Sequence, residues 1–187
     1  MEIYSPSWKE TEQYKILYHE MGKKPVSGAR YTGILGQILK SKDIKTVWDY
    51  GCGINHILIT HVVKNFPNVN ITGYDPVFKK NTKRFQNYIT NDSVDMIIST
   101  DCLEHLWEHE LDICFGYWKK KNPKYIFVTT CNRLAHKNLP DGTNAHKIIK
   151  PVEWWIKTIQ TYFPDHKVSS EFSTNVNDVR DTIFFEK

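Results

Sequence analysis

The chain has 187 residues, of which 40% are hydrophobic, 25% are charged and 13% are aromatic, and its formal net charge is +4. This length and composition predict one globular domain with a full hydrophobic core. The positive charges are spread along the chain, which argues against a nucleic-acid-binding groove, and no apolar stretch approaches the ~20 residues of a membrane span.

The predicted elements begin with two helices, over residues 8–21 and 29–41. From residue 45 onward, strands and helices alternate. The predicted strands are 45–50, 70–75, 95–100, 124–130, 166–173 and 180–186, with a weak one near 85–89. The predicted helices among them are 54–65, 102–119 and 151–163, and a long polar loop occupies 131–149.

Alternating strands and helices predict an α/β fold with a mostly parallel sheet that is covered on both faces. The turn from Asn175 to Asp178 is too short for a helical crossover, so the last two strands are expected to pair antiparallel. We expect a single domain in which residues 44–187 form the core. Residues 1–43 are expected to form a helical lid or a substrate-side extension.

The most informative pattern follows the first predicted strand. Asp49 ends the apolar run, Gly51 and Gly53 come next, and a helical pattern begins near Asn55. Glycine permits positive φ and lets a ligand approach the backbone closely. A Gly-x-Gly pair alone is compatible with a dehydrogenase, a methyltransferase or a structural turn.

Two acidic residues narrow this choice. Asp75 ends the next predicted strand, where a carboxylate can accept hydrogen bonds from both hydroxyls of a ribose. Asp49 lies before the glycines, where it would repel the pyrophosphate of a dinucleotide. The two together favour a nucleoside ligand that carries a cation, such as an ammonium or a sulfonium.

Three ordered motifs resemble class I S-adenosylmethionine (SAM)-dependent methyltransferases, in particular the small-molecule type with a Leu-Glu-His motif. They are Asp49–Gly53, Gly73–Pro76 and Asp95–Leu106. The resemblance implies a Rossmann-like, doubly wound sheet of seven strands with an antiparallel C-terminal pair. It also implies SAM as the cofactor and methyl transfer to an oxygen or nitrogen of a small-molecule acceptor.

The same resemblance assigns the cofactor site. Gly51 and Gly53 would lie against the methionine portion, Asp49 would order the loop or the amino group, and Asp75 would hold the ribose. Residues at the end of the fourth strand would face the methionine portion. The full predicted set is Asp49, Gly51, Cys52, Gly53, Asp75, Pro76, Thr100 and Asp101.

The chain departs from the family pattern in three places. Asn55 replaces the third glycine of the loop, and the segment between Asp75 and Asp95 is short. Only Asn91 and Asp92 stand where an adenine-binding acid is expected. Cys52 and Cys102 flank the cofactor loops and are expected to pack rather than to act as nucleophiles. All four cysteines lack a Cys-x-x-Cys spacing, which predicts free thiols in a cytoplasmic protein.

The histidines allow two interpretations. Residues 105–109 match the His-x-x-Glu-His pattern of inverted zinc peptidases, in which His105 and His109 would lie one helical turn apart. The pattern lacks a third ligand and the methyltransferase motifs already explain its context, so no metal is predicted. His105 is instead the candidate catalytic residue, as a general base beside the methyl group, or it packs the helix start. Glu104 is expected to be structural.

The polar loop 131–149, which contains His136 and His146, is expected to shape the acceptor site or to be solvated. Three other functions remain open. They are a catalytically weak SAM-binding or scaffold subunit, a methyltransferase that acts on RNA or protein, and an NAD-dependent oxidoreductase. Asp49 disfavours the oxidoreductase, and the missing Asn/Asp-Pro-Pro-Tyr/Phe motif counts against an amino-methylating DNA enzyme.

Overall fold

The computed structural model describes residues 8–21, 27–77, 93–175 and 180–187. Its α-helices are α1 (Trp8–Met21), α2 (Thr32–Ser41), α3 (Ile57–Asn65), α5 (Glu108–Lys120) and α6 (Val152–Tyr162). Two short 3₁₀ helices are η1 (Ser27–Tyr31) and η2 (Leu103–His105). The strands are β1 (Thr46–Tyr50), β2 (Asn70–Tyr74), β3 (Met96–Thr100), β4 (Tyr125–Cys131), β5 (Lys167–Val168), β6 (Thr174–Asn175) and β7 (Arg180–Glu186).

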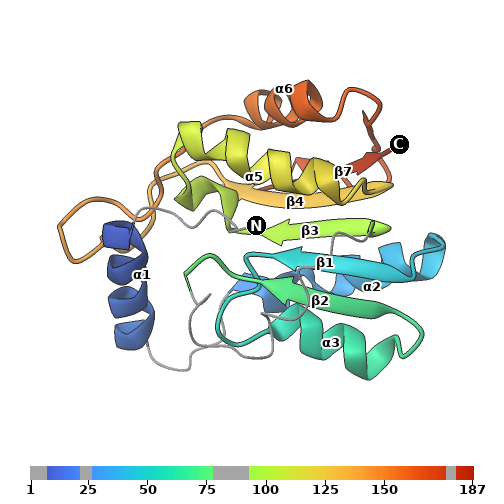
Figure 1. Cartoon of the computed structure of the whole chain (residues 1–187), viewed down its shortest axis with the longest axis horizontal. Helices are drawn as coiled ribbons and strands as arrows, with labels where there is room; N and C mark the ends of the chain where they lie inside the picture. Colours follow the sequence, from blue (N-terminus) through green and yellow to red (C-terminus); the bar gives the residue numbers. More distant parts are fainter. Residues whose placement is uncertain (1–7, 22–26, 78–92, 176–179) are drawn as a thin grey trace.

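The described strands form one mixed sheet in the order β2-β1-β3-β4-β7-β5, and β6 also pairs with β7. The pairs of β1 with β2, β1 with β3, and β3 with β4 are parallel, whereas β7 pairs antiparallel with β4, β5 and β6. The carboxyl ends of the four parallel strands therefore meet at one edge of the sheet, and α1 stands at that edge (Figure 1).

Alternate residues of the central strands supply two separate cores. Trp48 and Tyr50 pack with α5 and α6, whereas Val47, the residue before Trp48, packs with α2 and α3. This alternation follows from the pleat of a strand, in which successive side chains point to opposite faces. Figure 1 shows the same arrangement, with α5 and α6 over one face of the sheet and α2 and α3 over the other.

The expected α/β fold, the mostly parallel sheet and the antiparallel C-terminal strands are confirmed. The structure corrects the predicted strand 166–173, which contains only the two-residue β5. The weak strand near 85–89 lies outside the described residues, so the count of seven strands remains a prediction. Among the residues described, no helix is both long and apolar enough to cross a membrane.

The predicted helix 102–119 is divided in two, because the backbone is extended at Leu106 (ψ 158°) and at Trp107 (ψ 153°). The Trp107 N–H donates to the Glu110 carboxylate at 2.8 Å, which caps the start of α5. The helix predicted from residue 54 begins only at Ile57, because His56 adopts a left-handed conformation with φ 47°.

Phe127 of β4 lies in the core between the sheet and helices α2 and α3, so its replacement measures how much this core contributes to stability. Its side chain is 1% exposed, and its ring lies edge-on to that of Tyr31 at 6.5 Å between centroids. We expect Phe127→Ala to lower the free energy of unfolding by about 3–5 kcal/mol, because a large buried ring leaves a cavity. Urea unfolding followed by circular dichroism measures this loss. Val63→Ala, at a position that is 62% exposed, should change it by less than about 0.5 kcal/mol; equal losses would contradict the expectation.

Candidate functional site

A cavity of about 330 Å³ lies at the carboxyl edge of the parallel strands. This volume falls within the range of about 300–1,000 Å³ that is typical of small-molecule sites. Its walls come from the loop after β1, the first turn of α3, the end of β3 and more distant residues of α1, η1, η2, the loop 131–149 and β7. Lining residues that the following paragraphs use are Asp49, Gly51, Gly53, Asp101, His105, His146 and Arg180.

The two glycines of the loop after β1 have different tasks. Gly51 has φ 85°, and a Cβ atom added there would lie 2.3 Å from the Cys102 sulfur. Gly53 has φ 62°, and, its chain neighbours aside, no atom of the described residues lies within 4 Å of the place where its Cβ would be. Gly51 is therefore needed for packing, whereas Gly53 leaves an open face of backbone toward the cavity.

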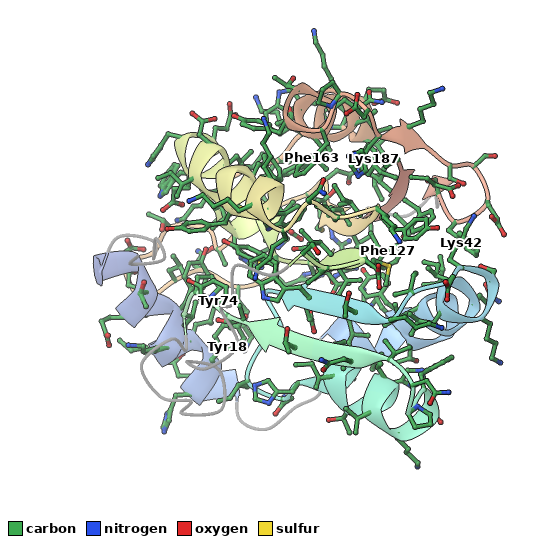
Figure 2. The ribbon with its side chains drawn as sticks, turned by 45° about the vertical axis from the view of Figure 1, so that its right-hand side comes forward. Tyr18, Lys42, Tyr74, Phe127, Phe163 and Lys187 are labelled. Atoms are coloured by element: carbon green, nitrogen blue, oxygen red, sulfur yellow. The ribbon has the colours of Figure 1, made fainter. Side chains whose placement is uncertain are left out.

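Asp75, after β2, fixes the position of this loop. One carboxylate oxygen accepts a hydrogen bond from the Gly53 N–H at 2.9 Å, and the other accepts one from the Val77 N–H at 2.9 Å. Asp75 and Pro76 do not line the large cavity but an adjoining pocket of about 40 Å³. Because Gly51 lines both spaces, the pocket continues the cavity toward the end of β2. Figure 2 shows Tyr18 of α1 near this end, close to Tyr74 of β2.

Asp49 is a buried carboxylate at the wall of the cavity. It is 1% exposed, and its Oδ1 atom has no hydrogen-bond partner among the described residues. Burial raises the pKa of Asp49 to about 8, and the negative charge of Asp75 adds to this effect. A cation in the cavity would stabilise the charged form of this carboxylate.

Asp101 is held by side chains from three elements. Its Oδ1 accepts hydrogen bonds from the Tyr31 hydroxyl at 2.7 Å and from the Thr129 hydroxyl at 3.1 Å. Its Oδ2 accepts one from Arg180 Nε at 3.3 Å. The backbone of Asp101 has φ 45°, a conformation that costs a non-glycine residue energy. These contacts keep the carboxylate at the cavity wall, beside the buried Thr100.

His105 also lines the cavity, at the end of η2. Its Nδ1 lies 2.9 Å from the carbonyl oxygen of Ala145, which itself accepts a hydrogen bond from the Tyr14 hydroxyl at 2.6 Å. Because a carbonyl only accepts, Nδ1 carries the hydrogen and Nε2 keeps its lone pair. Burial lowers the pKa of His105 to about 4, and the neighbouring His146 contributes, so the imidazole is neutral near pH 7.

The His-x-x-Glu-His pattern does not form one helical face. The extended backbone at Leu106 and Trp107 separates His105 from α5, on which His109 is exposed. The structure instead places His105 next to His146 of the loop 131–149, with 4.8 Å between ring centroids.

The loop 131–149 is fixed to the rest of the site by backbone hydrogen bonds. The Lys147 and Ile148 N–H groups donate to the Glu104 carbonyl oxygen at 2.7 and 3.0 Å. The Cys131 N–H donates to the Glu104 carboxylate at 3.1 Å. Glu104 therefore anchors the loop, and the loop contributes His146 to the cavity wall.

Cys52 and Cys102 remain protonated thiols. Burial raises the pKa of each well above its usual value, and neighbouring acidic groups add to this effect. Both cysteines lack the lowered pKa of a nucleophilic thiolate. All four cysteines are free, as the spacing predicted.

The sequence predictions omitted Arg180, Thr129 and the pairing of His105 with His146. Arg180 belongs to the last strand and Thr129 to β4, so no local motif connects either of them with Asp101. The only signal for His146 was its place in a long loop after a parallel strand. The candidate adenine-binding residues Asn91 and Asp92 lie outside the described residues.

No protein-family model matches this sequence, and no curated protein matches it. Solved structures do match. A SAM-dependent methyltransferase from Archaeoglobus fulgidus is 17% identical, with a TM-score of 0.56, over 93% of this chain and 100% of that chain. The mitomycin 7-O-methyltransferase MmcR is 13% identical, with a TM-score of 0.59, over 96% of this chain and 60% of that chain. The methyltransferase domain of bacterial CtHen1-CN is 17% identical, with a TM-score of 0.56, over 83% of this chain and 97% of that chain.

The neighbours share the Rossmann-like fold of class I SAM-dependent methyltransferases, and this chain has that fold. At these low identities the likeness concerns the fold. The site described above is therefore interpreted from its own residues.

The two loop glycines give a matched pair of variants. Both have positive φ, so alanine should cost about 1–2 kcal/mol of backbone strain at either position. Gly51→Ala must also displace Cys102, so its loss of stability should be clearly larger than that of Gly53→Ala. Thermal unfolding of the two variants measures the difference, and a Gly53→Ala variant as unstable as Gly51→Ala would contradict it.

The raised pKa of Asp49 predicts a pH-dependent stability. Its pKa is about 8 in the folded protein, compared with 3.8 for an unperturbed aspartate, the value taken for the unfolded chain. The folded state therefore binds the proton more tightly, so this stabilisation is complete below the lower value and is lost as the pH rises through the higher one. Asp49→Asn should remove this pH-dependent contribution to stability. The melting temperature of the variant should therefore increase relative to that of the wild type as the pH rises from about 5 to about 9. Parallel melting curves over this interval would contradict the expectation.

Proposed function

We propose that this chain is a SAM-dependent methyltransferase that transfers a methyl group to an oxygen or nitrogen of a small-molecule acceptor. The observation that carries the proposal is Asp49, whose buried Oδ1 atom has no partner among the described residues at the wall of the cavity. Gly53 adds an open face of backbone to the same wall. A carboxyl group whose ionised form a cation would stabilise, together with bare backbone, suits a cationic nucleoside better than a pyrophosphate.

The predicted cofactor residues divide between the two joined spaces. Asp49 would face the ammonium of the methionine portion, and the backbone of residues 51–53 would lie along it. Asp75 and Pro76 would hold the ribose in the small adjoining pocket. Thr100 and Asp101 would border the methionine portion from the end of β3. When bound, SAM supplies a methyl group on a positively charged sulfur that is a good leaving group.

The chain's own task is then to orient the acceptor and to exclude water. Contacts of α1 support a lid role for this helix. The Tyr14 hydroxyl reaches the Ala145 carbonyl, and Gln13 exchanges two hydrogen bonds with Asp141 at 2.9 and 3.0 Å. These bonds join α1 to the loop 131–149 over the edge of the sheet. They support the division into a lid, residues 1–43, and a core, residues 44–187.

His105 remains our candidate for the catalytic residue, with one restriction. A general base with a pKa of about 4 removes a proton from an ordinary hydroxyl only slowly near pH 7. The site therefore suits an acceptor whose hydroxyl pKa is lowered by a group other than His105.

RNA is a second candidate acceptor, favoured by one surface feature. Trp107 is 41% exposed, two residues from His105, and the Lys147 ammonium lies 5.2 Å from its ring centroid. Exposed aromatic rings beside positive charge are surfaces on which single-stranded bases stack. One neighbour in fold is the small RNA methyltransferase HEN1, whereas MmcR is a mitomycin 7-O-methyltransferase.

Calorimetry with SAM, S-adenosylhomocysteine (SAH) and NAD tests the function. We expect binding of the two adenosyl ligands and none of NAD. Turnover of tritiated SAM is then measured with a panel of hydroxyl- and amine-bearing small molecules and with short single-stranded RNAs. Binding without turnover on the whole panel would favour the scaffold alternative, and the absence of SAM and SAH binding would overturn the proposal.

Asp75 gives the sharpest mutational prediction. Asp75→Asn should weaken SAH binding by more than about tenfold, because a charge-assisted hydrogen bond to the ribose is lost. The same residue also positions the glycine loop, so a 2′-deoxyribose analogue of SAH serves as the control ligand. The wild type should bind the analogue more weakly than SAH, whereas the variant should discriminate less between them. Equal discrimination by both proteins would mean that Asp75 only shapes the loop.

A further inference from the structure

We propose that Glu104, His105 and His146 form a binding site for a divalent transition-metal ion in the wall of the cavity. One potential ligand atom from each residue lies within 4.8 Å of the other two. Two of the residues come from η2, and the third comes from the loop after β4, so the fold brings together groups that are distant in sequence. This set differs from the pair His105 and His109 of the sequence pattern.

Both imidazoles are already held in the tautomer that a metal needs. Nδ1 of His105 lies 2.9 Å from the Ala145 carbonyl, and Nδ1 of His146 lies 2.6 Å from the Arg133 carbonyl. In each ring Nδ1 therefore carries the hydrogen, and Nε2 presents its lone pair. A hydrogen bond from the second nitrogen to a carbonyl is the usual support of a metal-binding histidine. Both histidines line the cavity.

Glu104 provides an independent observation. Its side chain is fully buried, and its Oε2 atom has no hydrogen-bond partner among the residues described. The structural role of Glu104 accounts for its other oxygen, which accepts the Cys131 N–H. A buried carboxylate oxygen without a partner is costly unless a positive group meets it. A metal ion between the three residues would supply that group.

The geometry needs only a small adjustment. At the tetrahedral angle, two atoms that each bind an ion at about 2.1 Å lie about 3.4 Å apart. The potential ligand atoms lie within 4.8 Å of one another, so each pair must close by at most about 1.4 Å. Two imidazoles and one carboxylate suit Zn²⁺, Mn²⁺, Co²⁺ or Fe²⁺ better than Mg²⁺, which prefers oxygen ligands. Three protein ligands leave coordination positions free for an acceptor.

The ion would give the weakly basic site a means to activate an acceptor hydroxyl; this role rests on the proposed function, whereas metal binding does not. A hydroxyl bound to the ion has a lowered pKa and loses its proton to water. Its oxygen then forms the bond to the methyl carbon while the sulfur–carbon bond breaks and leaves its electron pair on sulfur. The cavity that His105 and His146 line also contains Asp49 and Gly53, so acceptor and donor would meet there.

The test uses the full chain without a histidine tag, stripped with EDTA and dialysed. Titration with Co²⁺, followed by its visible absorption, and with Mn²⁺ and Zn²⁺ by calorimetry should show about one ion per chain. Mg²⁺ should bind far more weakly. Glu104→Gln, His105→Ala and His146→Ala should each lower the affinity by more than about tenfold. Circular dichroism verifies that each variant folds.

Two matched variants serve as controls. Glu108→Gln and His109→Ala change the same residue types at exposed positions of α5 and should bind Co²⁺ as the wild type does. The absence of stoichiometric binding by the wild type would overturn the proposal. Wild-type affinity in all three ligand variants, or a loss of affinity in His109→Ala, would do the same. SAH binding is measured separately without metal, so its failure would reject the proposed function and leave the metal site standing.

Discussion

The carboxylate of Asp75 is the constraint on which the cofactor edge of the sheet depends. It accepts hydrogen bonds from the backbone of Gly53 and of Val77, and so it joins the loop after β1 to the end of β2. Parallel pairing of these strands brings the two segments to the same edge. With the loop fixed there, Gly51 packs against Cys102, and Gly53 keeps its open face toward the cavity. One carboxyl group thus helps to determine the shape of the backbone at this edge.

Acidic groups dominate the electrostatics of this edge, but they differ in how far hydrogen-bond donors and positive charges compensate them. Asp101 is compensated by Arg180 and by two hydroxyl groups. Asp49 and Glu104 each have one oxygen without a partner among the described residues. The pKa of Asp49 is raised to about 8 and that of Glu104 lies well above its usual value, in both cases mainly because of burial. Positive ligands would therefore be stabilised at two separate places, which fits a cationic donor at one and a metal ion at the other.

The fold was largely predictable because its signals are local. Strands 45–50, 70–75, 95–100 and 124–130 were placed to within one residue, since short apolar runs between turn residues have few alternatives. Errors arose where a single residue changed the backbone. His56 delays the start of α3 by its left-handed conformation, and the extended Leu106 and Trp107 divide the predicted helix 102–119. Neither feature follows from periodicity or composition.

The sequence by itself determined the class of fold and the glycine loop between Asp49 and Asp75, because these residues act on neighbours in one βα unit. Only the tertiary structure decided how His105 is used. The sequence pattern joined it to His109 on an imagined continuous helix, whereas the folded chain places it beside His146, forty-one residues further along. The loop 131–149 reaches that position through hydrogen bonds to Glu104 and Tyr14. Contacts between such distant segments depend on how the elements at the carboxyl edge of the sheet pack together, and the spacing of residues in the sequence does not predict them.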